Sequence, residues 1–386
     1  MKLLAKRDPS PTVQTPRVQT FAGVHVHQQR LVITDVGGNQ HEIPAVWFRD
    51  NCLCTECRIA ATGEHRYFLG TTPELPDATS VQLQDGTMTI VWSDGHSTTV
   101  SAEDLATISH IADRTLTPAQ PWGAGFTPAR FNRADIVRDT ATCHEFLTTA
   151  LRDGIAIVTE MGIESGECIR FLEDLALPVR DTPFDRLHDV FYRIDGYNVA
   201  HTDEALPPHN DFASYTWPPS GQLIHMLVNE VTGGEWVNVD GFHVIAQLWQ
   251  MHPDAFRTLA HIPIAFREHS DTAESWTREP LIRIDSLGNV TGLRFSNQLM
   301  QPMSPFDPDV QEFYEAYHLL ARAICDPANQ IEFRAEPGTM QFLHGHRVLH
   351  SRRAFDGSSG ARHLQDTYFD FDDVASLVAL MSGDAR

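Results

Sequence analysis

Three cysteines close together in sequence form the clearest metal-binding pattern of the chain. Cys52, Cys54 and Cys57 have the spacing Cys-x-Cys-x-x-Cys, and His96 follows later in a glycine-containing turn. Three thiolates and one imidazole are the closed tetrahedral set that structural zinc prefers, whereas catalytic zinc needs an open position. Free cysteine is often simply buried, so three ordinary core cysteines are the alternative. The tight spacing favours structural zinc.

A second pattern, His209-Asn210-Asp211, has the composition of a catalytic metal site. Alternate residues of a strand point to the same face, so His209 and Asp211 can chelate one metal together. One further histidine would complete a two-His-one-carboxylate triad, which leaves open positions on Fe(II) for a bidentate co-substrate and O₂. Because the chain has 20 histidines, a His-x-Asp pair also arises by chance, and a solvated surface histidine is the alternative.

The third ligand must come from far along the chain, and residues 344–353 offer three histidines. His350 lies among apolar residues typical of a strand, whereas His344 and His346 flank a glycine. Spacing alone does not choose among the three, although the strand context favours His350.

Arg362 opens another β-like run shortly after these histidines. Oxygenases that use 2-oxoglutarate need a guanidinium to hold the far carboxylate of that co-substrate, and arginine does so in a bidentate pair. An exposed strand arginine is the alternative interpretation of this residue.

Composition limits the partners. The chain has 386 residues, 42% of them hydrophobic, with 29 Lys and Arg against 51 Asp and Glu, for a net charge of −22. This acidity should repel nucleic acid and anionic membranes, so a cationic or zwitterionic small molecule is the more natural partner. No apolar run approaches the ~20 residues of a membrane span, and the N-terminus lacks a signal-peptide pattern. We therefore expect no nucleic acid, no membrane and a cytoplasmic location.

Turn signals and composition divide the chain into four parts. Residues 1–20 read as a flexible tail, 21–112 as a β-rich zinc-binding domain, 113–126 as a Pro/Gly-rich linker and 127–386 as the catalytic domain. Asp85-Gly86, between two alternating runs, predicts a β-hairpin. In the catalytic domain we expect helices at 134–153, 165–175, 242–252 and 308–323, and strands at 154–158, 338–343 and 363–371. This order favours a mainly β, α+β fold, a jelly roll decorated with helices.

Taken together, the motifs resemble the gamma-butyrobetaine dioxygenase and trimethyllysine dioxygenase family of 2-oxoglutarate-dependent oxygenases. The stretches that carry the resemblance keep their order over roughly residues 22 to 375, and they are Trp47–Cys57, Asn198–Ala200, His209–Asp211, Val231–Gly234, Val239–Phe242, Leu349–Arg353 and Arg362–Leu364. Joint occurrence of the cysteine motif and the triad is much more specific than either alone.

The resemblance implies an N-terminal zinc domain and a catalytic double-stranded β-helix. It implies two sets of metal ligands: His209, Asp211 and His350 for Fe(II), and Cys52, Cys54, Cys57 and His96 for zinc. Arg362 falls on the family's 2-oxoglutarate clamp, Asn198 on a position at the substrate and co-substrate pocket, and Asn297 close to one that holds the acidic end of the substrate. Members of the family are commonly homodimers.

The substrate pocket departs from the family pattern. Members that act on trimethylammonium substrates surround the cation with Tyr and Trp, because a quaternary ammonium ion is bound by ring faces. The approximately matching positions here are Phe184, His188, His201 and Tyr368, and Phe212 stands where members carry Tyr. Other rings available to complete a cage are those of Tyr192, Tyr197, Tyr215 and Trp217. The departures weaken the case for gamma-butyrobetaine itself and point to a related betaine or amine.

The resulting hypothesis is a hydroxylase that uses Fe(II), 2-oxoglutarate and O₂ and releases succinate and CO₂. It needs no protein nucleophile, because the cofactors supply the oxidising power. Two alternatives make different predictions: a metal-dependent hydrolase needs a nearby general base and no Arg362, and an iron-free, zinc-stabilised binding module should have a broken triad.

Overall fold

The computed structural model describes residues 20–112, 117–183, 185–192, 199–269, 273–286 and 288–382. The chain divides between residues 115 and 116 into two compact units. Two of the predicted site residues, Phe184 and Asn198, and the alternative ring Tyr197 lie outside the described residues.

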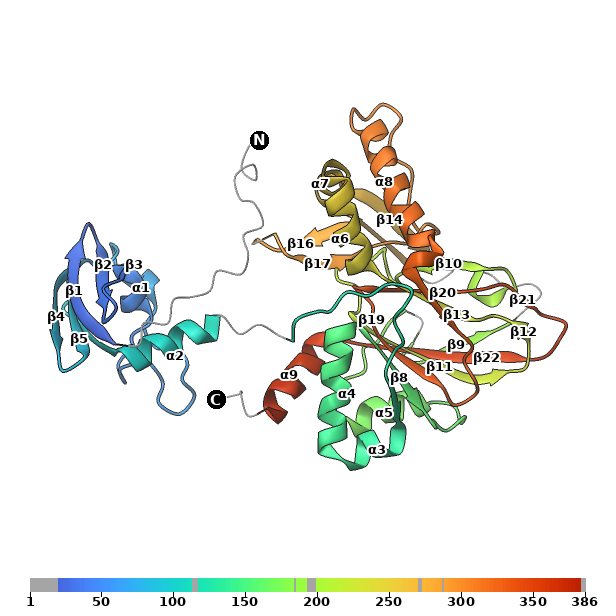
Figure 1. Cartoon of the computed structure of the whole chain (residues 1–386), viewed down its shortest axis with the longest axis horizontal. Coiled ribbons are helices and arrows are strands. Elements are labelled where there is room, and N and C mark those ends of the chain that lie inside the picture. The colour runs from blue at the N-terminus through green and yellow to red at the C-terminus, as the bar shows by residue number, and fades with distance from the viewer. Residues whose placement is uncertain are drawn as a thin grey trace. The chain divides into compact units, whose positions relative to one another are not determined.

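The N-terminal unit consists of two antiparallel sheets and short helices (Figure 1). One sheet contains β1 (Phe21–His27), β2 (Arg30–Asp35) and β3 (Gln40–Pro44), and the other contains β4 (Ala78–Gln84), β5 (Thr87–Trp92) and β6 (Ser97–Ser101). The helices are α1 (Ala45–Asp50), α2 (Ala102–Ala112) and the 3₁₀ turn η1 (Leu69–Thr71). Buried Leu31, Met88 and Trp92 belong to its hydrophobic core.

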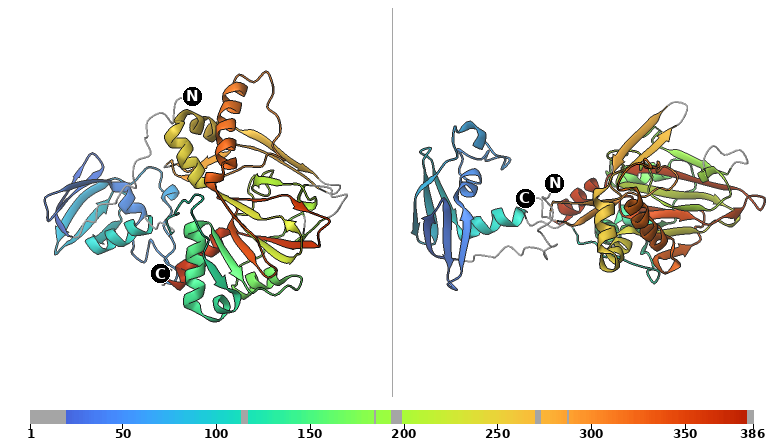
Figure 2. Two further views of the ribbon diagram at one scale, coloured as in Figure 1. Left: turned by 45° about the vertical axis from the view of Figure 1, so that its right-hand side comes forward. Right: turned by 90° about the horizontal axis from the view of Figure 1, so that it is seen from above.

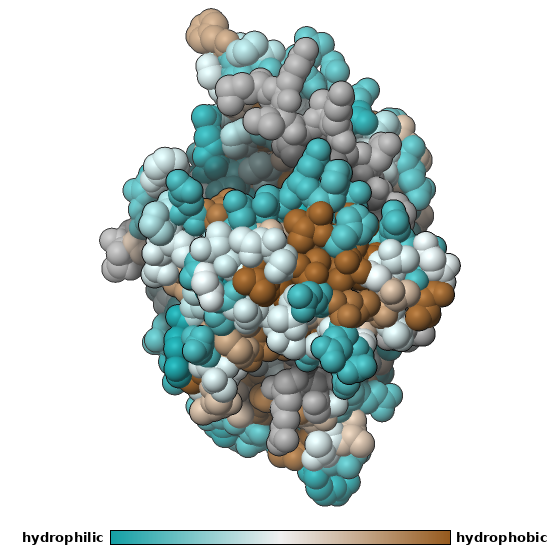
Figure 3. Space-filling view, turned by 90° about the vertical axis from the view of Figure 1, so that its left-hand side faces the viewer, coloured by the Kyte–Doolittle hydropathy of each residue, from teal (hydrophilic) through white to brown (hydrophobic). Residues whose placement is uncertain are grey.

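The predicted hairpin at Asp85-Gly86 is confirmed, because these two residues join β4 to β5. Both have positive φ angles, 50° and 76°, as a two-residue type I′ turn requires. This unit also exposes several large apolar side chains, namely Val36, Leu53, Phe68 and Leu75. With this part of the chain toward the viewer, Figure 3 shows apolar surface gathered near the centre of the face between hydrophilic borders.

The larger unit has two main sheets. The six-stranded sheet has the strand order β7 (Arg130–Asn132), β8 (Ile155–Thr159), β19 (Met340–His344), β11 (Gly221–Asn229), β22 (Arg362–Phe369) and β9 (His188–Phe191). The four-stranded sheet has the strand order β10 (Leu206–His209), β20 (Val348–Arg352), β13 (Trp236–Asp240) and β18 (Gln330–Phe333). Buried Ile157 and Leu364 of the first sheet and Trp236 and Val348 of the second belong to one apolar cluster. The sheets therefore face each other, and the predicted double-stranded β-helix is confirmed.

Helices cover the sheets in two groups on opposite sides of the strands (Figures 1 and 2). The first group, α3 (Arg133–Arg138), α4 (Thr140–Asp153), α5 (Glu167–Asp174) and α9 (Phe371–Met381), shares a core with the six-stranded sheet. The second, α6 (Gly241–Met251), α7 (Pro253–His261) and α8 (Val310–Cys325), shares a core with β14 (Ile264–His269), β16 (Ile282–Ile284) and β17 (Val290–Leu293). The smaller elements are β12 (Thr232–Gly233), β15 (Glu274–Glu279), β21 (Phe355–Asp356), η2 (Val199–His201) and η3 (Pro327–Asn329).

The helix predicted at 134–153 is in fact two helices. Asp139 has an extended backbone, and its side chain accepts a hydrogen bond from the Thr142 backbone N–H, so it ends α3 and caps α4. Four further helices, α1, α2, α7 and α9, were not predicted. Within the segment expected to be a linker, the Trp122 indole is buried and donates to the Asp153 carbonyl, so this stretch packs into the larger unit.

Among the residues that the structure describes, none of the helices combines the length and apolarity needed to cross a membrane.

Candidate functional site

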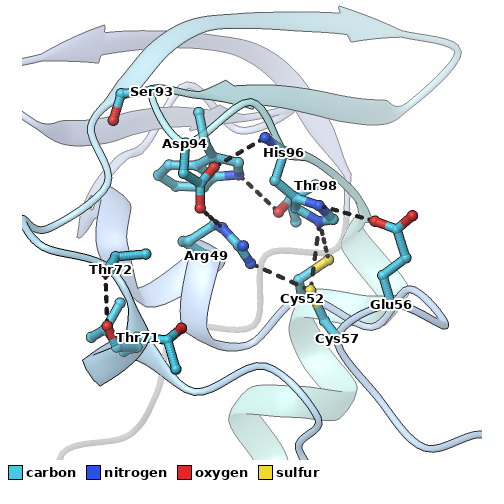
Figure 4. A network of polar contacts seen from close by, with 12 residues as sticks. Arg49, Cys52, Glu56, Cys57, Thr71, Thr72, Ser93, Asp94, His96 and Thr98 are labelled. Carbon is cyan, nitrogen blue, oxygen red and sulfur yellow. Dashed lines mark hydrogen bonds and ion pairs between the residues drawn. The ribbon is translucent and has the colours of Figure 1, made fainter.

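The cysteine motif and His96 come together in the N-terminal unit (Figure 4). His96 Nε2 lies 3.4 Å from the Cys52 sulfur, 3.7 Å from that of Cys54 and 3.6 Å from that of Cys57. With Zn–S of about 2.3 Å and Zn–N of about 2.0–2.1 Å, a tetrahedral ion would hold N and S about 3.5 Å apart. The donor set and its spacing therefore fit a four-coordinate zinc ion.

Neighbouring polar groups hold this cluster in place. Arg49 donates from Nη1 to the Cys57 sulfur at 3.3 Å and from Nε to Asp94 at 2.8 Å, and Asp94 accepts from the His96 backbone N–H (Figure 4). Burial, together with nearby Cys52, raises the pKa of the Cys57 thiol to about 12, although Arg49 acts in the opposite direction. A bound dication is what would keep such a thiol deprotonated at neutral pH.

The second pattern assembles between the two sheets of the larger unit. His209 of β10 stands directly opposite His350 of β20 in the antiparallel register. Asp211 Oδ1 lies 3.3 Å from His209 Nε2 and 3.7 Å from His350 Nε2. The three side chains can each turn one ligand atom to the same ion, since these atoms lie within 4.8 Å of one another. One carboxylate and two imidazoles with this spacing fit the Fe(II) triad.

Hydrogen bonds fix the orientation of two of the three ligands, His209 and Asp211. His209 Nδ1 lies 2.9 Å from the Pro207 carbonyl oxygen, so it carries the proton and leaves the Nε2 lone pair for a metal. Asp211 Oδ2 accepts from Gln222 Nε2 and from the Tyr368 hydroxyl, both at 2.7 Å, which leaves Oδ1 toward the histidines. Gln222 and Tyr368 are paired residues of β11 and β22.

Electrostatics favour the metal-binding protonation states of Asp211 and His350. Burial opposes ionisation of Asp211, but His350, His209 and Tyr368 together hold the pKa of its carboxyl well below the usual range. Burial and nearby His209 lower the pKa of His350 to about 4, so its imidazole is neutral at neutral pH. A neutral imidazole and an ionised carboxylate are the protonation states that metal ligation requires.

Arg362 begins β22 and is 5% exposed. It has no ion-pair partner in the described part of the chain, and its Nε has no hydrogen-bond partner there. Burial and the charge of Arg352 lower the pKa of Arg362 to about 9. By contrast, Arg352 donates to several backbone carbonyls, including those of Ala200 and Thr202. A buried guanidinium that forms no ion pair with a described residue fits the distal carboxylate of 2-oxoglutarate.

The structure divides the remaining predicted pocket residues. Phe212 and Tyr368 lie beside Asp211, with ring centroids 4.8 Å apart. The His188 and His201 rings form another pair, 6.0 Å apart. Tyr192 lies at a different place: its ring packs against Phe355, which also lies 5.4 Å from the Arg362 guanidinium.

Two of the residues expected in the substrate pocket, Asn297 and Trp217, have exposed side chains. Asn297 is exposed in the loop after β17, where its side-chain oxygen accepts from the Tyr317 hydroxyl at 3.1 Å. Trp217 is 71% exposed, so it does not supply a buried ring. The spacing of residues in the sequence could not have predicted that these two side chains are exposed.

Three residues near the triad were missed by sequence reasoning. Gln222 supports Asp211, and Asn210 accepts from the Phe295 backbone N–H and donates to the Gly345 carbonyl. Asp366, two residues before Tyr368, is buried on the face of β22 that carries Arg362. Only the register of the sheet shows that Gln222 and Asp366 lie in the interior that contains the triad. Asn210 could have been found from the sequence, because it is a polar residue between two predicted metal ligands.

A cavity of about 210 Å³ has Asn210 and Asp211 in its wall, but neither His209 nor His350 lines it. Arg283 and Arg294 give the cavity positive charge, which Glu279 partly offsets. Arg294 donates to the Tyr215 carbonyl, and Arg283 donates to His346 Nδ1 at 2.7 Å.

Comparisons with known proteins agree with this geometry. The model of the taurine catabolism dioxygenase TauD, TfdA family matches residues 112–368, and the gamma-butyrobetaine hydroxylase-like N-terminal model matches residues 23–106. Gamma-butyrobetaine dioxygenase of Pseudomonas sp. (strain AK-1) is 28% identical over 375 residues, 95% of this chain and 97% of that protein.

Two eukaryotic proteins match over nearly the same length. Human gamma-butyrobetaine dioxygenase is 25% identical over 88% of this chain and 90% of its own length. Trimethyllysine dioxygenase of Meyerozyma guilliermondii is 23% identical over 90% of this chain and 92% of its own length. The likeness thus spans both units.

Proposed function

The chain belongs to the taurine catabolism dioxygenase TauD, TfdA family, and on that premise we propose how its residues carry out the reaction and which substrates it accepts. It is a 2-oxoglutarate- and Fe(II)-dependent dioxygenase. We assign the oxygenase chemistry to the unit after residue 115 and a structural zinc site to the unit before it.

The observation that carries the assignment is the convergence of His209, Asp211 and His350. These residues would hold Fe(II) from one side and leave the other side for small molecules. When bound with 2-oxoglutarate and O₂, the iron supplies the oxidising power that hydroxylates an unactivated C–H bond, with release of succinate and CO₂. The Pro207 carbonyl fixes the tautomer of His209, and Gln222 and Tyr368 fix the rotamer of Asp211.

The role that we give Arg362 is to bind and orient the co-substrate. Its guanidinium is desolvated and unpaired in the described chain, so an incoming carboxylate gains a strong charge-assisted interaction there. We place 2-oxoglutarate between Arg362 and the triad, on the inner face of β22.

The substrate that we propose is a small zwitterion or cation, such as a betaine or an amine. The relatives are named for gamma-butyrobetaine and trimethyllysine, which are ammonium compounds with an acidic end. The charge of this chain favours a cationic partner, and Arg283 and Arg294 in the cavity beside Asp211 offer positive charge to an acidic end.

No specific observation favours either alternative, the metal-dependent hydrolase or the iron-free binding module. The binding-module alternative expects a broken triad, but all three ligands are present and close together. The hydrolase alternative gives no role to the buried, unpaired guanidinium of Arg362.

The test is conversion of 2-oxoglutarate to succinate by the purified full-length chain with Fe(II), in the presence of a panel of betaines, amino acids and aminophosphonates. We expect at least one compound to stimulate succinate formation, and Asp211→Ala to abolish it. The control variant is His318→Ala, which removes an exposed histidine of α8 and should keep full activity. Metal-dependent hydrolysis without succinate formation would contradict the proposal.

We also propose that the protein is a cytoplasmic homodimer. The apolar surface of the N-terminal unit supports an interface, since large exposed apolar patches mark interaction sites (Figure 3). Sedimentation velocity tests the oligomeric state, and a monomer at micromolar concentration would contradict it.

A further inference from the structure

Asp366 lies on the inner face of β22. Residues 362, 364, 366 and 368 alternate with outward-facing neighbours, and Leu364 belongs to the core between the two sheets. In the antiparallel register, Asp366 stands opposite His188 of β9 and Ile224 of β11. Its side chain therefore points into the same interior as Arg362 and Tyr368.

The carboxyl group of Asp366 is buried, and one of its oxygens lacks a hydrogen-bond partner among the described residues. The residue is 8% exposed, and its Oδ1 has no hydrogen-bond partner among the described residues. Its Oδ2 lies 4.0 Å from His188 Nδ1. A buried polar atom that lacks a partner is costly, and such a group in a native protein calls for an explanation.

The available charges near Asp366 already have other roles. Burial and the negative charge of Asp211 raise the pKa of Asp366 well above the usual range, whereas Arg362 opposes the shift. In the proposed mechanism, a bound iron ion would match the charge of Asp211, and bound 2-oxoglutarate would match that of Arg362. Asp366 then has no counter-ion of its own.

The groups around Asp366 are suited to a cation that carries N–H. The His188 and His201 imidazoles lie nearby as a pair, and the rings of Phe212 and Tyr368 lie farther along, beside Asp211. A quaternary ammonium ion has no N–H to donate and depends on ring faces. A carboxylate accepts a charge-assisted hydrogen bond from the N–H of a primary or secondary ammonium group, and a quaternary ammonium ion cannot donate one.

We propose that Asp366 is a specificity-determining residue and that it binds an N–H-bearing cation of the substrate, a primary or secondary ammonium group, in preference to a quaternary one. This inference rests on the proposed function, since it places the substrate beside the triad. The substrate's nitrogen donates to Oδ1, and the two opposite charges are buried together.

The experiment compares unbranched ω-amino acids of increasing chain length, each as the free amine and as its N,N,N-trimethyl derivative. The full-length enzyme with Fe(II), 2-oxoglutarate and O₂ is used, and kcat/KM is measured from succinate formed above the substrate-free rate. At the best chain length, we expect the free amine to exceed its trimethyl derivative by roughly tenfold or more, the value of one charged hydrogen bond.

Variants test whether Asp366 is the cause. Asp366→Asn keeps the side-chain volume, and it should lower kcat/KM for the amine roughly 10- to 100-fold while the trimethyl derivative changes little, so that the selectivity ratio collapses. Asp372→Asn removes an exposed carboxylate shortly after β22 and should leave the ratio unchanged. Asp366→Ser replaces Asp366→Asn if the latter does not fold.

Each other outcome is informative. Preference of the wild type for the trimethyl form, equal losses for both forms in Asp366→Asn, or no stimulation by either series while 2-oxoglutarate is still consumed would each overturn the inference and leave the proposed function intact. If the wild type forms no succinate with any compound, the proposed function fails and the inference fails with it.

Discussion

The two candidate metal centres differ in the number of ligands and in how the fold assembles them. The N-terminal centre has four ligands, three of them within Cys52–Cys57, and their spacing closes a tetrahedron. The centre of the larger unit has three, which strand pairing joins from distant parts of the chain. A closed set of ligands stabilises a fold, whereas an open set leaves room for chemistry.

Their surroundings differ in the same sense. Around the cysteines, polar neighbours such as Arg49 and Asp94 satisfy one another. Around the triad, Arg362 and Asp366 are buried ionisable groups without hydrogen-bonded ion pairs among the described residues. Unmatched buried charge is expensive in a core and useful in a binding site, so the contrast separates a structural region from a reactive one.

The largest effect is expected from Cys54→Ser. Structural zinc contributes roughly 10–16 kcal/mol of apparent binding free energy, so loss of a ligand should release zinc and destabilise the N-terminal unit. Zinc per chain, measured by mass spectrometry, and hydrogen exchange of β4–β6 report this change. Cys325→Ser, at an exposed cysteine, is the control. Loss of turnover in a variant that stays folded and keeps its zinc would break the distinction between the two centres.

Arg362→Ala should have the next largest effect. Truncation of one partner of a buried charge pair costs about 2–5 kcal/mol, so the half-saturation concentration of 2-oxoglutarate should rise at least tenfold. Arg353→Ala, at an exposed arginine paired with Glu332, should not change it. An unchanged half-saturation in Arg362→Ala would mean that another residue holds the co-substrate.

Tyr368→Phe removes one donor to Asp211 and keeps the ring. Loss of such an outer partner typically lowers metal affinity or activity by about 10- to 100-fold. Fe(II) titration of turnover measures the change, and Tyr314→Phe on α8 is the matched control. If both variants behave like the wild type, the orientation of Asp211 does not depend on this hydrogen bond.

The smallest effect is expected from Glu56→Gln, which changes an outer partner of the zinc ligand His96 as Tyr368→Phe changes an outer partner of the iron ligand Asp211. Glu56 lies 3.5 Å from His96 Nδ1, but its side chain is 82% exposed. Exposed ion pairs contribute little, so Glu56→Gln should change zinc affinity less than about fivefold. Competition with a chelator measures it. A loss as large as that of Tyr368→Phe would show that the closed centre depends equally on its outer partners.

Sequence predicted best what is encoded locally. The Asp85-Gly86 hairpin follows from turn chemistry, and the cysteine cluster follows from spacing within a few residues. The break between α3 and α4 also had a local signal, an aspartate followed three residues later by a threonine, but the continuous helical pattern masked it.

What sequence could not settle depends on strand register. Spacing left three histidines open as the third ligand, and only the pairing of β10 with β20 places His350 opposite His209. Likewise, the pairing of β11 with β22 brings Gln222 to Asp211. In the sequence, nothing distinguishes Asp366 from other polar residues. Only its burial in the sheet indicates a role in substrate binding.

One anaerobic titration addresses the assignment of the open centre. Fe(II) and then 2-oxoglutarate are added to the wild type, His350→Ala and His346→Ala, and the visible charge-transfer band of the ternary complex is recorded. We expect the band in the wild type and in His346→Ala, and its loss in His350→Ala. A band of full intensity in His350→Ala, or none in the wild type, would contradict the assignment of His209, Asp211 and His350 as the iron ligands.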